Sequence, residues 1–230
     1  MRVSIVIPAL NEAATIGSVV NAVREFGHPI VVDDGSDDGT SDIATAAGAT
    51  IVRHDLNAGY DAAIESGFKE ALRAAADIVV TFDADGQHDA QLVPKMFAPF
   101  EAAEIELVIG VRDRSARLSE VCFNQYARWR YGIGDILCGL KAYRIGLYRT
   151  HGPFDATPSI GTGMALRALQ SGARFEMVDV PITRRRDQAR IGSAFRANMS
   201  ILGALGATIA ADLTNTVRTG GRGHDRMSTH

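Results

Sequence analysis

The chain has 230 residues, of which 46% are hydrophobic and 22% are charged, and its formal net charge is −3 at pH 7. This length is enough for one substantial α/β domain, and the slightly acidic balance argues against a dedicated nucleic-acid binder. The two cysteines, Cys122 and Cys138, are too few for a disulfide framework or a zinc site.

Neither end of the sequence has the pattern of a membrane segment. The apolar run Val3–Leu10 is short and is interrupted by Asn11–Glu12, so we do not expect a signal peptide. The uncharged stretch Ala197–Ala211 falls short of the ~18–20 residues that a membrane-spanning helix needs. We therefore expect a cytoplasmic protein, either soluble or bound peripherally to the inner face of the membrane.

Strand and helix patterns alternate over the first 82 residues. We predict strands at Val3–Ile7, Ile30–Val32, Thr50–Val52 and Asp77–Phe82, with helices between them at Ala13–Phe26, Ser41–Ala47 and Ala58–Ala75. This alternation predicts an α/β fold whose mainly parallel sheet is covered by helices on both faces.

The alternation is looser after Phe82. We predict helices at Ala90–Ala102, Ser119–Tyr131, Pro158–Gln170 and Ala194–Asp212, strands at Leu107–Gly110 and Arg174–Val180, and a basic loop at Thr183–Ser193. No segment has the composition of a linker. We therefore expect a single domain over residues 1–212, followed by a disordered polar tail over residues 213–230.

Polar clusters follow three of the predicted strands, at Pro8–Glu12, Asp33–Ser36 and Asp83–Gln87. In parallel sheets, ligands bind outside the carboxyl ends of the strands. The shared placement of the clusters therefore predicts a binding site at this edge of the sheet.

The segment Asp83-Ala84-Asp85 is the most specific of these clusters. Two carboxylates at positions i and i+2 of a loop can both turn toward one hard divalent cation, which would neutralise a bound diphosphate. In Asp33-Asp34-Gly35-Ser36, a carboxylate can accept hydrogen bonds from a base or a ribose. Ordinary turns with solvated acids are the alternative for both segments.

Four motifs carry a resemblance to a known family. They are Ile7-Pro8-Ala9-Leu10-Asn11-Glu12, Val32-Asp33-Asp34-Gly35-Ser36-Asp37-Asp38-Gly39-Thr40, Asn57-Ala58-Gly59 and Asp83-Ala84-Asp85-Gly86-Gln87-His88. In this order and spacing the chain resembles the family-2 inverting glycosyltransferases, which have the Rossmann-like GT-A fold. It looks most similar to the polyprenyl-phosphate (dolichyl-phosphate) mannose and glucose synthases, because of Gln87-His88, the segment Asp135–Arg144 and the late arginine-rich loop.

The resemblance implies a nucleotide-sugar donor, such as GDP-mannose or UDP-glucose, bound with Mg²⁺ or Mn²⁺. By position, Asp83 and Asp85 would bind the metal and the diphosphate, and Asp135 would face the acceptor as a candidate general base. The other residues that the resemblance places around the donor or the acceptor phosphate are Pro8, Ala9, Glu12, Asp34, Ala84, Gln87, Arg117, Arg186 and Arg190.

The chain departs from the family pattern in several places, among them Gly110-Val111-Arg112, where Gly-Ser-Arg is usual. Tyr60-Asp61 stands where the family usually has Lys-Gly or Leu-Gly, and Gly161-Thr162-Gly163 begins a segment that often carries a carboxylate. These departures leave open a non-catalytic nucleotide-sugar-binding module. A dinucleotide oxidoreductase is a poor alternative, because no Gly-x-Gly-x-x-Gly follows the first strand.

The acceptor is less constrained by the sequence than the donor. A lipid phosphate is already ionised near neutral pH, so Asp135 would mainly orient it, whereas a saccharide or other hydroxyl acceptor needs a base. Phe123, Tyr126 and Trp129 alternate with arginines in one predicted helix. This pattern fits peripheral membrane contact, packing on the core, or the interface of a homodimer.

Overall fold

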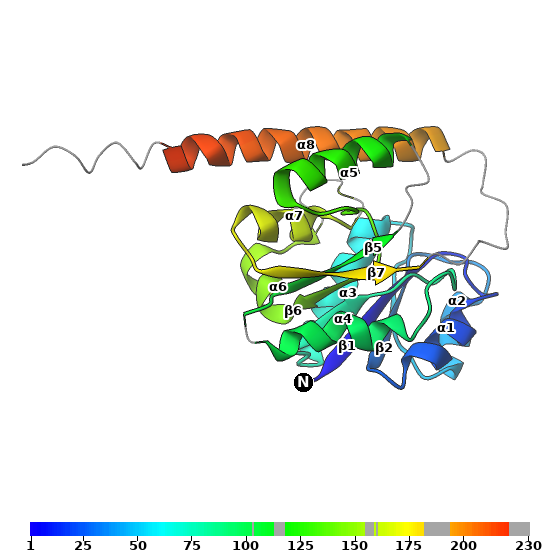
Figure 1. Ribbon diagram of the computed structural model, residues 1–230. Coiled ribbons are helices and arrows are strands. Elements are labelled where there is room, and N and C mark those ends of the chain that lie inside the picture. The colour runs from blue at the N-terminus through cyan, green and yellow to red at the C-terminus, as the bar shows by residue number, and fades with distance from the viewer. Residues whose placement is uncertain (103, 113–117, 155–158, 160, 182–193, 221–230) are drawn as a thin grey trace, which may run out of the picture.

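The computed structural model describes residues 1–102, 104–112, 118–154, 159, 161–181 and 194–220. A seven-stranded sheet in the order β3-β2-β1-β4-β6-β5-β7 forms its centre (Figure 1). The strands are β1 Val3–Ala9, β2 His28–Asp33, β3 Thr50–Arg53, β4 Ile78–Thr81, β5 Leu107–Arg112, β6 Lys141–Arg144 and β7 Phe175–Val180.

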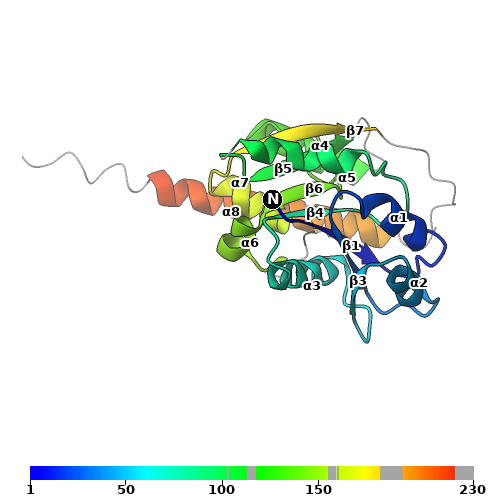
Figure 2. The same cartoon turned by 90° about the horizontal axis from the view of Figure 1, so that it is seen from below.

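Helices cover both faces of the sheet, as the alternating pattern predicts. They are α1 Ile16–Val23, α2 Thr40–Ala46, α3 Tyr60–Arg73, α4 Leu92–Phe97, the 3₁₀ helix η1 Ala98–Glu101, α5 Leu118–Tyr131, α6 Ile145–His151, α7 Gly163–Gln170 and α8 Ala194–Gly220. One apolar core lies between the sheet and α1, α2, α4 and η1, and a second lies between the sheet and α3 with α5 to α8. The view from below shows α1 and α2 beside β1 and β3 (Figure 2).

Burial explains why the first strands form as predicted. In β1 every residue from Ser4 to Ala9 is buried, and in β4 all of Ile78–Thr81 are buried. A strand that is covered on both faces needs such a run of mostly apolar residues. Parallel pairing of β1 with β2 and with β4 then brings the carboxyl ends of these strands to the same edge of the sheet.

The structure differs from the sequence prediction mainly in the second half of the chain. Strand β6 and helix α6 were not predicted, and β6 pairs antiparallel with both β4 and β5. Helix α7 begins at Gly163 rather than at Pro158. Helix α8 continues to Gly220, past Leu213, where the disordered tail was expected to begin.

The outer layer over the second core is made by α5 and α8, which lie side by side at the top of Figure 1. Asp212 of α8 is buried and accepts hydrogen bonds from the hydroxyls of Tyr126 and Tyr131 of α5, both at 2.7 Å. These bonds fasten the long helix to the rest of the domain. Among the described residues, no helix is long and apolar enough to span a bilayer.

Candidate active site

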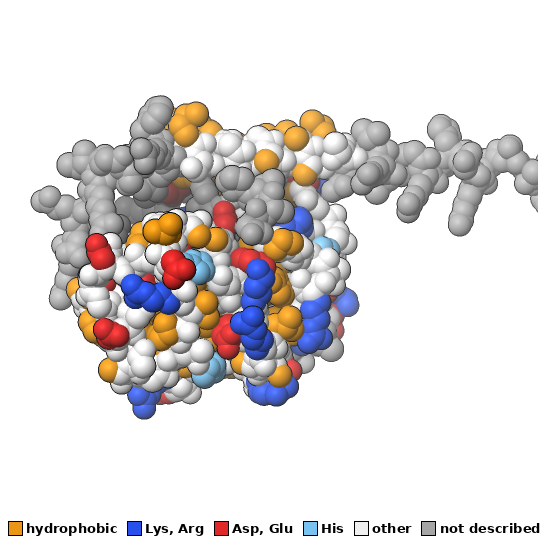
Figure 3. All heavy atoms as spheres, turned by 180° about the vertical axis from the view of Figure 1, so that it is seen from behind, with side chains coloured by type: hydrophobic (Ala, Val, Ile, Leu, Met, Phe, Trp, Pro, Cys, Tyr) orange, Lys and Arg blue, Asp and Glu red, His pale blue; other side chains and the backbone are white. Residues whose placement is uncertain are grey.

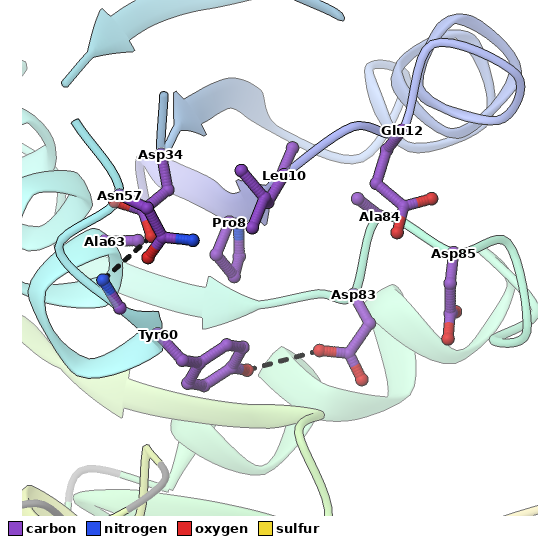
Figure 4. A pocket seen from close by; sticks show the side chains of 12 residues that line it. Pro8, Leu10, Glu12, Asp34, Asn57, Tyr60, Ala63, Asp83, Ala84 and Asp85 are labelled. Carbon is purple, nitrogen blue, oxygen red and sulfur yellow. Dashed lines mark hydrogen bonds between the residues drawn. The ribbon is translucent and has the colours of Figure 1, made fainter. Parts of the chain in front are cut away.

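A pocket of about 410 Å³ opens where β1, β2 and β4 end (Figure 4). Its lining comes from the end of β1, from the loops after β1, β2, β3 and β4, and from the start of α3. It comprises Pro8, Ala9, Leu10, Glu12, Asp34, Asn57, Gly59, Tyr60, Ala63, Asp83, Ala84 and Asp85.

The structure brings together most of the residues that the resemblance placed around a donor. Seven of them line the pocket: Pro8, Ala9, Glu12, Asp34, Asp83, Ala84 and Asp85. Gln87 and Asp135 are not among the lining residues, although the backbone N–H of Gln87 donates to Oδ1 of Asp85 at 3.0 Å. Arg117, Arg186 and Arg190 and the basic loop Thr183–Ser193 lie outside the described residues.

The loops after β1 and β2 are joined by polar contacts that shape one end of the pocket. The backbone N–H of Asn11 donates to Oγ of Ser36 at 2.9 Å, and the backbone N–H of Glu12 donates to Oγ1 of Thr40 at 2.9 Å. Asp33 is fully buried and accepts bonds from the N–H of Ser36 and the guanidinium of Arg53. The first acid of the Asp-Asp pair therefore holds the turn and leaves the second acid to face the pocket.

Asp34 is fixed by the polypeptide around it. Its Oδ1 accepts from the N–H of Ala58, and its Oδ2 accepts from the N–H of Gly59, both at 2.9 Å. Nδ1 of His54 lies 2.7 Å from Oδ1, and this nitrogen must carry the proton because a carboxylate only accepts. Oδ2 keeps a lone pair for a donor such as a base N–H or a ribose hydroxyl.

Asp83 lies at the opposite end of the pocket, two residues after the end of β4. Its Oδ1 accepts from the hydroxyl of Tyr60 at 3.2 Å, and its Oδ2 accepts from Nε2 of His88 at 3.1 Å. Burial raises the pKa of Asp83. The hydrogen bond and charge of His88 and the hydrogen bond from Tyr60 lower this pKa by more, so the pKa lies below its ordinary value. The carboxylate is therefore anionic at neutral pH.

Asp83 and Asp85 together suit a divalent cation whose remaining ligands come from a bound substrate. Asp83 has a side chain that is 30% exposed, and Asp85 lines the pocket two residues later. Among the described residues, no group of three or more His, Cys, Asp or Glu side chains could hold a metal ion alone. Mg²⁺ is commonly bound by one or two carboxylates together with substrate phosphates and water, and the pair fits that mode.

Asp135 is buried and forms an ion pair with the half-buried Arg112, outside the pocket lining. Its Oδ2 is 2.6 Å from Nε of Arg112, and its Oδ1 accepts from Nη2 of Arg112 at 3.1 Å and from Nδ2 of Asn124 at 3.0 Å. Burial raises the pKa of Asp135, but Arg112 outweighs this effect through hydrogen bonds and charge, so the pKa lies below its usual range. Such an anion is a weak base, and the arrangement favours an orienting role over proton abstraction.

The sequence analysis assigns no role to Tyr60, which lines the pocket, or to Arg112, which binds Asp135. Tyr60 was noted only as a departure from the family pattern, and the partnership of Arg112 with Asp135 spans 23 positions. The predicted alternation of strands and helices could have placed Tyr60 near the pocket, because the helix before β4 begins at Tyr60, at the edge of the sheet where the pocket opens. No local signal pairs Arg112 with Asp135.

Comparisons with known proteins identify the same family of transferases. The model of the family described as glycosyl transferase family 2 matches residues 4–152. An undecaprenyl-phosphate mannosyltransferase from Micrococcus luteus is 32% identical over 80% of this chain and 83% of its own length. A polyprenol monophosphomannose synthase from Mycolicibacterium smegmatis is 30% identical over 79% of this chain and 77% of its own length. Two further relatives match over about half of their own length, 46% and 53%.

A solved structure supports the same fold. The glucosyl-3-phosphoglycerate synthase from Mycobacterium tuberculosis, in complex with Mn²⁺ and UDP-glucose, superposes with a TM-score of 0.75 at 25% identity. The match covers 90% of this chain and 78% of that one. This neighbour confirms the predicted GT-A fold, and its Mn²⁺ is consistent with a divalent cation in such sites.

The ion pair of Asp135 and Arg112 should make the free energy of unfolding depend on pH. Asp135→Asn should lower the free energy of unfolding by about 2 kcal/mol near neutral pH, because it leaves the half-buried guanidinium of Arg112 with only the more distant carboxylate of Glu120, 3.8 Å away. Since the pKa of folded Asp135 lies below its ordinary 3.8, this stabilisation is complete above about pH 4 and is lost as the pH falls through the lowered pKa. Urea unfolding at about pH 7, 5 and 3 measures the difference.

The exposed Asp37 provides the control, because Asp37→Asn makes the same chemical change at the surface. It should shift the free energy of unfolding by less than about 0.5 kcal/mol at each pH. An equal penalty for Asp135→Asn at pH 7 and pH 3 would contradict a charge-dependent role.

Proposed function

The chain belongs to glycosyl transferase family 2, and we propose that it moves a hexose, with inversion, from a nucleotide diphosphate sugar to a polyprenyl phosphate. One observation carries the proposal: Asp83 and Asp85 line the same pocket as Glu12 and Asp34. The two carboxylates that would bind a cation and a diphosphate thus lie at one end of the pocket. At the other end lies Asp34, which can accept hydrogen bonds from a nucleoside.

Each residue then has a part in binding the donor. Asp34, with a free lone pair on Oδ2, would accept a hydrogen bond from the base or ribose, and Pro8 and Ala9 would pack against the nucleoside. Asp83 and Asp85 would hold Mg²⁺ or Mn²⁺. A cation there would neutralise the charge that develops on the departing nucleotide diphosphate. GDP-mannose and UDP-glucose both fit this description.

A lipid-phosphate acceptor is supported by the names of the two relatives and by the surroundings of Asp135. A phosphate monoester is ionised near neutral pH and can attack the anomeric carbon without losing a proton. A buried carboxylate whose pKa is lowered by Arg112 would serve such an acceptor by holding the guanidinium in place. A hydroxyl acceptor, the alternative, would need a stronger base.

Metal and nucleotide binding can be tested together by thermal unfolding. UDP or GDP at about 100 times its Kd should raise the Tm by about 5 °C or more when Mn²⁺ or Mg²⁺ is present, and much less in EDTA. Asp83→Asn and Asp85→Asn should each abolish the metal-dependent part, because each removes an anionic ligand.

The matched control is Asp89→Asn, which removes an exposed negative charge in the same loop outside the pocket lining. This variant should behave as the wild type does. Indifference of the wild type to every nucleotide would remove the proposal, whatever the metal.

The acceptor is tested by incubating labelled donor with a short polyprenyl phosphate or with a free saccharide. Label should enter the lipid product, and Asp135→Asn should keep measurable turnover because the phosphate needs no base. Complete loss of turnover, with folding and donor binding intact, would favour a hydroxyl acceptor and count against the lipid.

A lipid acceptor requires the chain to reach a membrane surface, and the layer of α5 and α8 supports peripheral contact. Trp129 is 78% exposed and is flanked by exposed Arg128 and Arg130, a combination that suits anionic headgroups. Exposed apolar side chains continue along both helices, as the upper edge of Figure 3 shows for α8. They are Leu118, Val121, Met199, Leu202 and Leu213.

Co-sedimentation with vesicles tests this contact. The wild type should bind vesicles of anionic lipid and release at high salt, and Trp129→Ser should weaken binding severalfold. Leu56→Ser is the control, because Leu56 is 81% exposed on the loop after β3. If the wild type does not bind vesicles and forms a dimer that Trp129→Ser dissociates, this face is instead a subunit interface.

A further inference from the structure

Tyr60 and Asp61 begin α3 and contact two parts of the chain that are far apart in sequence. Tyr60 reaches the acid at the end of β4, where its hydroxyl donates to Oδ1 of Asp83 at 3.2 Å (Figure 4). His88 holds the other oxygen at 3.1 Å. A β-carbon on Gly139 would lie 2.5 Å from Oδ2 of Asp83, so a third segment closes on the carboxylate.

Asp61 points to the segment before α7. Its Oδ2 accepts from the backbone N–H of Ser159 at 2.8 Å, and its Oδ1 accepts from the Ser159 hydroxyl at 3.1 Å and from the N–H of Gly161. Ser159 is buried and Asp61 is half-buried, so these bonds are partly shielded from water. Asp61 therefore anchors this segment to the first turn of α3.

The anchored segment packs on the Tyr60 ring. Gly161 has a φ of +70°, and a β-carbon there would lie 2.6 Å from Cε1 of Tyr60. Any larger residue would push the ring away from its position. The ring is thus confined between Gly161 and the pocket, with its hydroxyl directed at Asp83.

We propose that Tyr60 is a positioning residue for the divalent cation: it orients the Asp83 carboxylate, and Asp61 keeps Tyr60 in place by fixing Ser159 and Gly161 beside it. The inference rests on the proposed function, in which Asp83 is a metal ligand. Hydrogen bonds to a ligating carboxylate fix the direction of its free lone pairs, and removing such a partner typically weakens metal binding 10- to 100-fold.

The test is Mn²⁺ affinity, measured from the electron paramagnetic resonance of free Mn²⁺ with UDP or GDP present. Tyr60→Phe keeps the ring against Gly161 and removes only the hydroxyl, so the Kd for Mn²⁺ should rise about tenfold while the Tm without metal stays close to that of the wild type. Tyr126→Phe is the matched control, since it removes a tyrosine hydroxyl from Asp212, outside the pocket lining. It should leave the Kd for Mn²⁺ unchanged.

A double-mutant cycle with Asp61→Asn tests the second half of the inference. Asp61→Asn should also weaken Mn²⁺ binding, and the effect should largely vanish in the Tyr60→Phe background, because both changes act through the same hydroxyl. Additive effects would overturn the role of Asp61.

The outcomes also separate this inference from the proposed function. If the wild type and Tyr60→Phe bind Mn²⁺ equally, or the variant binds it more tightly, the positioning role is overturned and the proposed function stands. If the wild type binds no Mn²⁺ with either nucleotide, both are overturned.

Discussion

The site depends on the parallel pairing of β1 with β2 on one side and with β4 on the other. Ala9 lies opposite Asp33 and Val6 opposite Thr81, so the loops that carry Glu12, Asp34 and Asp83 leave the sheet at one edge. A slip of one residue would reverse which side chains of these strands face the helices. The two apolar cores therefore fix the register, and the register determines how far apart the acids lie.

The first half of the fold could be predicted from the sequence because its signals are local. β1 and β4 are buried runs of mostly apolar residues, and a polar cluster follows each of them. β6 carries no such signal: Lys141 and Arg144 bound it, and it forms where β4 and β5 offer antiparallel partners on both sides. Its burial is a consequence of tertiary structure, so periodicity alone could not reveal it.

The site could be predicted in its residue types but not in their pairing. The sequence identifies Asp135 as an acid after a glycine, but it does not reveal that Arg112 neutralises it. Similarly, Tyr60-Asp61 and Gly161-Thr162-Gly163 look like two unrelated departures from the family pattern. In the structure they form one contact, since Gly161 leaves room for the ring of Tyr60 and Asp61 holds the backbone of Gly161.

This contact joins two parts of the chain that the family match separates. Residues 4–152 include the whole pocket lining, whereas Ser159, Gly161 and α8 follow it. The later part is attached through two carboxylates: the half-buried Asp61 binds Ser159 and Gly161 before α7, and the buried Asp212 binds Tyr126 and Tyr131. Because a carboxylate that is taken wholly or partly out of water is costly without its donors, each attachment favours one arrangement of these segments. Ser159 with Gly161, and helix α8, are therefore held in defined positions relative to α3 and α5.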